Sequence, residues 1–241
     1  MRVLHVIARL NVGGTARYVT QLVNELPKHG IETLVATGFV QGAEVEDPTA
    51  VDIKLLRIKS LGRSINPIKD CFAQMQLQKI IKEFKPDIIH SHTFKAGLIV
   101  RARKQLIPVV HTFHGHHLYD PDYGKFAKVV LNLIERNLAK RCMKIITIGS
   151  KVGAELLDVG IGRSEQYFSI APGIESPKLS ERVRILNKFD LRGTTLKVLW
   201  MGRLTYVKRP DRVVELAIRY PKVDFVVAGD GELKEDLLAS A

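Results

Sequence analysis

Short apolar runs alternate with amphipathic segments along the chain, and this alternation predicts the order of the secondary structure. The run at 2–8 is apolar at most positions, whereas the segment at 15–29 places apolar residues three and four positions apart. The first pattern is typical of buried strands and the second of amphipathic helices. Strands are expected at 2–8, 31–37, 53–58, 87–92, 108–112, 144–148, 167–170, 196–201 and 223–228. Helices are expected at 15–29, 67–84, 94–105, 123–141, from 150, at 181–189, at 210–219 and in the last residues.

Strands that alternate with helices throughout predict an α/β fold with parallel strands and helices on both faces of the sheet. A polar stretch at 175–182 separates two parts, so we expect a Rossmann-like N-terminal domain at 1–183 and a second domain at 184–241. Two strands and two helices are too few to close a doubly wound domain, whose sheet must be covered on both faces. The second domain is therefore expected to be incomplete.

The net charge of +12 is the most unusual feature of the composition. Residues 1–183 carry 26 basic and 17 acidic side chains and residues 184–241 carry 11 and 8, so most of the excess lies in the first domain. Three partners are compatible with this charge: nucleic acid, an anionic membrane surface or an anionic substrate. Nucleic acid is disfavoured, because the basic residues are spread over many helices and no helix-turn-helix, zinc-finger or RNA-recognition signature is present.

The remaining composition indicates an ordinary globular protein, with 46% hydrophobic and 26% charged residues. No apolar stretch reaches the roughly 18–20 residues of a membrane span. The start of the chain leads directly into a glycine loop, which favours a core strand over a signal peptide. Cys71 and Cys142 form neither a disulfide framework nor a metal-binding spacing. They indicate a reducing cytoplasm, and both are expected to be small buried apolar residues.

A glycine loop follows the first expected strand. Gly13 and Gly14 would let the backbone approach a ligand, and the N-terminus of the next helix favours an anion. The dinucleotide-binding fingerprint is not met, because its third glycine is missing and Arg17 stands where close packing would be needed. The loop alone therefore predicts either an anion-binding turn or a tight turn without a ligand.

Six of the eight histidines lie at or just beyond the ends of two expected strands: His90, His92, His111, His114, His116 and His117. Such ends face the ligand cleft of an α/β sheet. His114, beside Gly115, is expected to project into the cleft as a donor to an anionic or hydroxyl-rich ligand. His111 is compatible with a hydrogen-bonded core residue, and His116 and His117 with exposed loop residues. A zinc site is the alternative, although no cysteine or carboxylate joins the histidines with ligand spacing.

Two cations follow the expected strand at 196–201. Gly202 and Arg203 come directly after it, and Lys208 lies five residues beyond Arg203. A second glycine turn at 229–231 follows the next strand, so it lies on the same edge of the sheet. Two cations at the carboxyl ends of parallel strands suit a diphosphate. The combination with both glycine turns favours a phosphate site over a solvated surface pair.

Taken together, these motifs resemble the retaining glycosyltransferases of family 4. The C-terminal motifs are Gly202-Arg203-Leu204, Lys208, Asp211 and Ala228-Gly229-Asp230-Gly231-Glu232. The N-terminal motifs, in the family's order, are Gly13-Gly14, His90-Ser91-His92, His111-Thr112-Phe113-His114-Gly115, Ile148-Gly149-Ser150 and Ala171-Pro172-Gly173-Ile174. The resemblance covers essentially the whole chain. It implies a GT-B fold, in which two Rossmann-like domains face each other across a cleft.

The resemblance implies transfer of a sugar from a nucleotide-sugar donor to an acceptor with retained configuration. By the family pattern, Gly13 and Gly14 contact the donor diphosphate from the first domain. Arg203 and Lys208 hold it from the second domain and stabilise the leaving nucleotide diphosphate. His114 contacts the transferred sugar near the reacting carbon. The two cations and His114 are thus the implied catalytic residues, and neither a metal ion nor another cofactor is implied.

The acceptor is expected to be a saccharide or a lipid-linked molecule. The positive charge of the first domain suits an anionic acceptor at a membrane surface. A cytoplasmic protein that binds peripherally to the inner face of the membrane would meet this expectation.

The sequence departs from the family in two places. The family's two glutamates, eight positions apart, are missing, since only Glu232, Glu235 and Asp236 are acidic after Gly231. We therefore expect a C-terminally truncated fragment. At Cys142-Met143-Lys144 the family often has an acidic residue. Two other functions stay open, a non-hydrolysing nucleotide-sugar epimerase with the same architecture and a non-catalytic acceptor-binding remnant.

Overall fold

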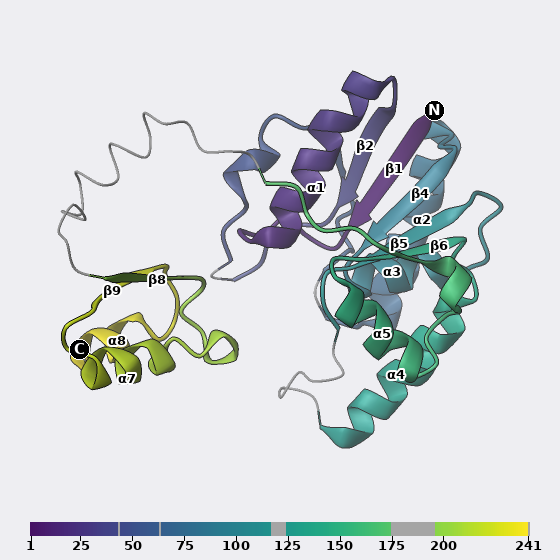
Figure 1. Ribbon diagram of the computed structural model, residues 1–241. Coiled ribbons are helices and arrows are strands. Elements are labelled where there is room, and N and C mark those ends of the chain that lie inside the picture. Colours follow the sequence, from purple (N-terminus) through teal and green to yellow (C-terminus); the bar gives the residue numbers. More distant parts are fainter. Residues whose placement is uncertain (43, 63, 117–123, 175–195, 241) are drawn as a thin grey trace. The chain divides into compact units, whose positions relative to one another are not determined.

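The computed structural model describes residues 1–42, 44–62, 64–116, 124–174 and 196–240. The chain divides into two compact units, Met1–Gly173 and Ile174–Ala241 (Figure 1). The predicted domain boundary between residues 183 and 184 and the predicted helix at 181–189 lie outside the described residues.

A seven-stranded parallel sheet forms the centre of the N-terminal unit, with the strand order β3-β2-β1-β4-β5-β6-β7. Every pairing in it is parallel, as the alternation of strands and helices predicted. The strands are β1 (Arg2–Ile7), β2 (Glu32–Thr37), β3 (Leu55–Arg57), β4 (Ile88–His92), β5 (Val109–Phe113), β6 (Lys144–Thr147) and β7 (Tyr167–Ser169).

Helices connect these strands. They are α1 (Gly14–Glu25), α2 (Pro67–Phe84), α3 (Phe94–Arg101), α4 (Lys125–Ala139) and α5 (Ser150–Asp158), with short 3-10 turns η1 (Leu26–His29), η2 (Pro48–Ala50) and η3 (Ser164–Gln166). At the start of α2, the Asn66 side chain accepts a hydrogen bond from Lys69 N at 3.0 Å, and Pro67 takes the first helical position. At its end, Lys85 adopts the left-handed conformation. None of the described helices is long and apolar enough to pass through a lipid bilayer.

Alternation of side chains along β1 divides the core of this unit into two layers. Leu4 and Val6 belong to the layer that includes buried residues of α2 and α3. Ile7 packs with Val19 of α1 in the other layer. Because successive side chains of a strand point to opposite faces, His5 lies on the same face as Ile7, under α1.

A buried ion pair links α3 and α4. Arg101 Nη2 lies 3.0 Å from Glu135 Oε1, and both side chains are fully buried. The predicted helix at 94–105 ends earlier than expected, at Arg101. Arg141 Nη1 donates to the carbonyl oxygens of Arg101 and Ala102 at 2.5 Å each, so another side chain satisfies carbonyls at this helix end.

The prediction that both cysteines are buried is wrong for one of them. Cys142 is buried, and its sulfur lies 3.8 Å from Arg101 Nη1. Cys71 is exposed on α2. The buried residues Ala73 and Leu77 define the inner side of this helix, and Cys71 falls on the opposite side.

The C-terminal unit contains a parallel two-stranded sheet. Its elements are β8 (Lys197–Met201), η4 (Tyr206–Lys208), α7 (Asp211–Arg219), β9 (Asp224–Ala228) and α8 (Lys234–Ser240). Leu199 and Met201 of β8 are exposed to 65% and 79%. The sheet of a complete doubly wound domain is covered on both faces, so these exposed apolar residues fit the predicted incomplete second domain.

Candidate functional site

The carboxyl ends of β1, β4 and β5 bring the predicted glycine loop and the histidines to one edge of the N-terminal sheet (Figure 1). The register pairs Ile7 with His92, and His92 with Thr112. The glycine loop continues from β1, and His114 comes directly after β5. Ligands of parallel α/β sheets bind at this edge.

Gly13 and Gly14 form the turn that the sequence predicted. Gly13 has a φ of +154°, a backbone conformation that residues other than glycine rarely adopt. A β-carbon at Gly14 would meet no atom within 4 Å, so the backbone there is open to a ligand. The structure thus provides the approach that phosphate binding needs, while the contact with a diphosphate stays a prediction.

The segment at 44–48, which lies between β2 and β3 in the chain, packs against the glycine loop. Val12 N donates to Val45 O at 2.9 Å, and Gly13 N lies 3.5 Å from Asp47 Oδ2. The Asp47 side chain is fully buried and lies 3.8 Å from Arg17 Nε. Arg17, the residue that departs from the dinucleotide-binding fingerprint, therefore pairs with the Asp47 carboxylate beside this loop.

Three histidines form a hydrogen-bonded chain beneath α1. His5 Nδ1 lies 3.2 Å from His92 Nε2, and His92 Nδ1 lies 3.3 Å from His114 Nε2. His90 lies beside this chain, with its ring centroid 4.0 Å from that of His92, and its Nε2 contacts Thr112 Oγ1 at 2.7 Å. The predicted cleft residue His114 is thus the outer end of a chain that reaches the buried His5.

His114 lines a hollow of about 230 Å³ at this edge. The ring of Tyr18 from α1 stands edge-on to the His114 ring at a centroid distance of 4.9 Å. Thr93 also lines the hollow, and its φ of +68° is unusual for a β-branched residue. Such a conformation costs about 1–3 kcal/mol, and the Thr93 hydroxyl is buried without a hydrogen-bond partner among the described residues. Strain of this kind concentrates at binding sites.

Burial keeps the imidazoles neutral. It lowers the pKa of His5 and of His114 to about 4. Burial, reinforced by the neighbouring imidazoles, also holds the pKa of His90 and of His92 well below the ordinary value. A neutral imidazole has one N–H and one lone pair, so each ring can donate one hydrogen bond and accept another. At neutral pH His114 is therefore a hydrogen-bonding group and not a cation.

Two further histidines among those predicted at the strand ends are described by the structure, and one of them differs from the prediction. His111 is fully buried and its Nδ1 lies 2.9 Å from Ser91 Oγ, so it is the hydrogen-bonded core residue that was expected. The prediction of an exposed His116 is wrong, because this side chain is 5% exposed and contacts Glu155 of α5 at 2.7 Å. Glu155 comes from a distant part of the sequence, so the loop pattern alone gave no sign of it. His117 lies outside the described residues.

The structure adds His5 to the histidines that could form the alternative zinc site. His5, His90 and His92 each offer a nitrogen within 4.8 Å of the others. No carboxylate among the described residues belongs to this group, so a divalent ion there would be a buried charge without a counter-charge. The hydrogen bonds of these rings to one another and to Thr112 give their nitrogens another use.

In the C-terminal unit, Arg203 and Lys208 lie on the segment that follows β8. Lys208 ends η4, and Arg209 after it has a φ of +51° and pairs with Asp211 at 2.6 Å. Hydrogen bonding to Arg209 lowers the pKa of Asp211. Neither Arg203 nor Lys208 makes an ion pair with a residue of the described part of this unit. Both predicted phosphate ligands are exposed, so their charges are available to a ligand.

The two glycine turns of this unit pack backbone against backbone. Gly202 N donates to Ala228 O at 3.0 Å, and Leu204 N donates to Asp230 O at 2.9 Å. A β-carbon at Gly229 would lie 1.9 Å from Gly202 O, so no side chain fits there. The spacing of glycines at both strand ends, which the sequence showed, thus has a packing reason in addition to the predicted ligand role.

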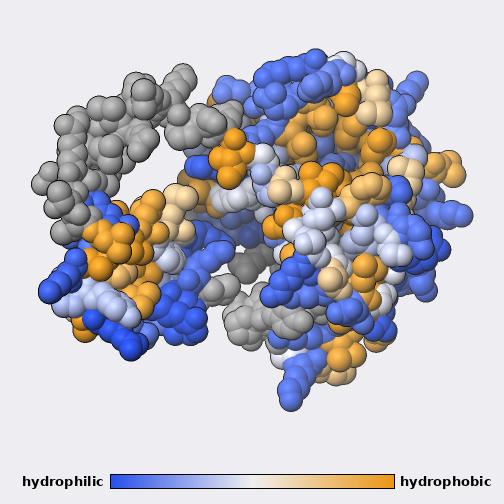
Figure 2. Space-filling view, in the orientation of Figure 1, coloured by the Kyte–Doolittle hydropathy of each residue, from blue (hydrophilic) through white to orange (hydrophobic). Residues whose placement is uncertain are grey.

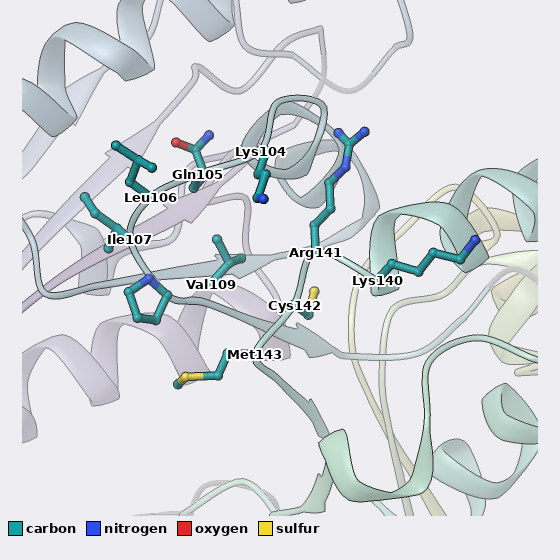
Figure 3. Close-up of a pocket in the computed structure, with 10 residues that line it drawn as sticks. Lys104, Gln105, Leu106, Ile107, Val109, Lys140, Arg141, Cys142 and Met143 are labelled. Atoms are coloured by element: carbon teal, nitrogen blue, oxygen red, sulfur yellow. The ribbon is translucent and has the colours of Figure 1, made fainter.

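A second hollow, of about 560 Å³, lies at the opposite edge of the N-terminal sheet (Figure 3). It is bordered by the residues that lead into β5 and β6, including Lys104, Lys140, Arg141 and Cys142. Arg141 is already used as a cap on the carbonyl oxygens at the end of α3. The amino ends of parallel strands are not where such sheets bind ligands, so we assign this hollow no role in the site.

Comparison with known proteins agrees with this arrangement. The family model for Glycosyltransferase Family 4 matches residues 12–175, which is more than half of the chain. The chain belongs to glycosyltransferase family 4. The UDP-Gal:alpha-D-GlcNAc-diphosphoundecaprenol alpha-1,3-galactosyltransferase of Escherichia coli is 30% identical over 203 residues, which cover 77% of this chain and 51% of that protein. The chain thus spans about half the length of this relative.

Solved structures show the fold. Anabaena HepE, determined in complex with UDP and glucose, superimposes with a TM-score of 0.73 at 16% identity. The superposition covers 99% of this chain and 64% of the HepE chain. The UDP-GlcNAc 2-epimerase of Neisseria meningitidis, bound to UDP-GlcNAc, gives a TM-score of 0.59 at 17% identity over 100% of this chain and 68% of its own. The predicted GT-B fold is confirmed, and similarity at these identities concerns the fold alone.

Proposed function

We propose that this family 4 chain contributes the acceptor side and part of the donor side of an enzyme that transfers a sugar from a nucleotide sugar with retention. The observation that carries the proposal is the pair of exposed cations, Arg203 and Lys208, beside two interlocked glycine turns at the carboxyl ends of β8 and β9. The UDP in the HepE structure and the UDP-linked donor in the name of the Escherichia coli relative support a uridine nucleotide.

In this reaction the bond between the anomeric carbon and the diphosphate oxygen breaks. The acceptor oxygen bonds to the same face of that carbon, and the acceptor proton leaves with the diphosphate. Arg203 and Lys208 stabilise the negative charge that develops on the departing diphosphate, so the step needs no metal ion. The backbone of Gly13 and Gly14 lies against the diphosphate, with the Gly14 N–H as the donor because Asp47 already accepts from Gly13, and neutral His114 forms a hydrogen bond with a sugar hydroxyl.

The donor side of this proposal predicts the effect of removing each cation. Charge-assisted hydrogen bonds contribute about 1.5–3 kcal/mol, so Arg203→Ala and Lys208→Ala are each expected to weaken UDP binding about 10- to 100-fold. Titration of UDP, followed by NMR shifts of the Gly202 and Leu204 amides, measures this dissociation constant. Lys222→Ala, which removes an exposed cation before β9, is the matched control and leaves the constant unchanged. Binding of neither UDP nor GDP, or equal weakening by all three variants, would refute the proposal.

The epimerase alternative is separated from glycosyl transfer by its products. Its support is the fold shared with the UDP-GlcNAc 2-epimerase of Neisseria meningitidis. An epimerase inverts a stereocentre of the donor sugar without an acceptor, whereas a glycosyltransferase releases UDP. Analysis of the sugar nucleotide after incubation with donor alone therefore decides between the two, with an inverted sugar as the outcome that favours the epimerase.

For the acceptor, we propose a lipid-linked saccharide at an anionic membrane surface, which α4 would contact. The apolar residues Phe126, Val129, Val130 and Leu133 lie on the exposed side of this helix, with Phe126 exposed to 83%. Its one acidic residue, Glu135, is buried against Arg101, so the exposed side carries only positive charge. Exposed apolar residues among lysines are typical of helices that lie in a membrane interface. The diphosphoundecaprenol in the name of the Escherichia coli relative fits such an acceptor.

This surface predicts reversible binding to vesicles that contain phosphatidylglycerol. Burying a large apolar side chain contributes about 1.5–3 kcal/mol, so the double variant Phe126→Ser/Leu133→Ser is expected to reduce the vesicle-bound fraction at least 10-fold in a sedimentation assay. Phe72→Ser/Met75→Ser removes comparably exposed apolar residues from α2 and serves as the control. Equal binding by both double variants would show that α4 is not the contact.

A further inference from the structure

The imidazole chain has a direction. It starts at His5, which is fully buried, passes through the fully buried His92 and ends at His114 on the hollow. His5 Nε2, at the inner end, has no hydrogen-bond partner among the described residues. His114 Nδ1, at the outer end, makes no hydrogen bond to any described residue either. Each end of the imidazole chain therefore has one ring nitrogen without a described partner, and the hydrogen bonds between the rings decide whether that nitrogen carries a proton.

Two proton arrangements satisfy both inner hydrogen bonds. In the first, each ring carries its proton on Nδ1, so that His5 donates to His92 and His92 donates to His114. In the second, each ring carries its proton on Nε2 and the donors point the other way. Mixed arrangements place two protons or two lone pairs in one contact, which loses a hydrogen bond.

The buried end decides between the two arrangements. If protons lie on Nε2, His5 has a buried N–H with no acceptor, and such orphaned donors are rare in native structures. If protons lie on Nδ1, His5 leaves only a buried lone pair unpaired, and an unpaired acceptor is the more tolerated of the two. The first arrangement then gives His114 an Nδ1–H that no described residue uses.

We propose that His92 is a positioning residue, which together with His5 holds His114 as the Nδ1–H tautomer and so presents a neutral hydrogen-bond donor to the ligand in the hollow. The identity of that ligand as the donor sugar rests on the proposed function, but the tautomer does not. A donor at this place selects a ligand oxygen with a lone pair, such as a sugar hydroxyl. The chain ends in the core, so it orients His114 and does not conduct protons to solvent.

The tautomer is measured directly in the ligand-free protein. Long-range ¹H–¹⁵N correlation spectra at pH 7.5 distinguish a protonated from an unprotonated ring nitrogen, and replacing each histidine in turn assigns the signals. We expect His114 and His92 to show a protonated Nδ1 and an unprotonated Nε2. An Nε2–H tautomer of His114 overturns the proposal, whatever the outcome of UDP binding. Because this measurement needs no ligand, it also separates the proposal from the proposed function.

Two substitutions of His92 then test its role. An asparagine amide lies near the position of Nδ1 and a glutamine amide near that of Nε2. His92→Asn is therefore expected to keep the donor to His114 and its Nδ1–H tautomer. His92→Gln keeps the contact with His5 only, and the protonated Nδ1 signal of His114 is expected to decline in favour of Nε2–H. Unchanged His114 tautomers in a folded His92→Gln variant would refute the positioning role, as would an equal change in both variants.

Discussion

Lowering the pH from 7.5 to 5 is expected to reduce the free energy of unfolding of the N-terminal unit by about 4 kcal/mol or more. Burial lowers the pKa of His5 and His114 from 6.5 to about 4 in the folded chain. At pH 5 the unfolded chain binds a proton on each of these residues and the folded chain does not. With about 1.4 kcal/mol per pKa unit, each site accounts for about 2 kcal/mol of the loss.

The free energy of unfolding falls at low pH because folding lowers the pKa of these basic side chains. Stability from these residues is fully present above pH 6.5 and declines as the pH falls towards 4, where the folded form also binds protons. Burial likewise lowers the pKa of His90, His92 and His111, so these residues act in the same direction. Because domains are stable by only about 5–15 kcal/mol, acid unfolding is expected near pH 5.

Denaturant titrations at pH 7.5 and pH 5, followed by NMR signals of β1 and β4, measure this difference. His114→Gln should remove about 2 kcal/mol of the pH dependence. The C-terminal unit supplies an internal control, since it has no histidine and contains the only tryptophan, Trp200. Equal free energies of unfolding at both pH values would contradict the prediction.

Arg101→Met is expected to lower the free energy of unfolding by about 3–5 kcal/mol, because it leaves the Glu135 carboxylate buried without its partner. Glu135→Leu is expected to be similarly destabilising, because it leaves the Arg101 guanidinium buried without its partner. Arg101 is also held by Gly97 O, which accepts from its Nε at 2.9 Å, so the side chain cannot turn out to water without losing a second contact. The pair therefore ties α3 to α4 at a place where neither charge reaches solvent.

The double variant Arg101→Met/Glu135→Leu distinguishes this cause from lost packing. Removing both charges is expected to recover most of the stability, because hydrophobic residues of similar volume replace buried ion pairs at little cost. Chemical denaturation of the four proteins gives the coupling free energy. Glu25→Gln, in the exposed pair with Lys28, is the control and leaves the stability nearly unchanged. Additive losses in the double variant would show that charge burial is not the reason.

The order of strands and helices could be predicted because apolar runs and helical spacing are local patterns. The edge strand β3 was the least accurate, since the predicted strand at 53–58 contains only Leu55–Arg57. It pairs with β2 alone, so fewer contacts define its ends. The end of α3 depends on Arg141, forty residues away from Arg101 along the chain, and no local pattern encodes that contact.

Candidate site residues could be selected where they follow single strands. Gly13, Gly14, His114, Arg203 and Lys208 were chosen because they follow apolar runs. The structure places them in the segments after β1, β5 and β8, and their contacts with a ligand stay a prediction. Contacts that require knowledge of which strands are neighbours could not be found. His5 joins the histidine chain only because β1 pairs with β4. Asp47 and Tyr18 likewise reach the site across long sequence separations. The one signal available in the sequence for His5 was a histidine at an inward-facing position of the first strand.

The interlocked glycine turns restrict how the donor side can be engineered. Because the turn after β9 supplies the surface on which the turn after β8 rests, the two turns form one structural unit. A chimera that imports Arg203 and Lys208 with their loop, but keeps a bulkier residue at 229, would push the imported loop off its support. Recombination between family members should therefore exchange both turns together.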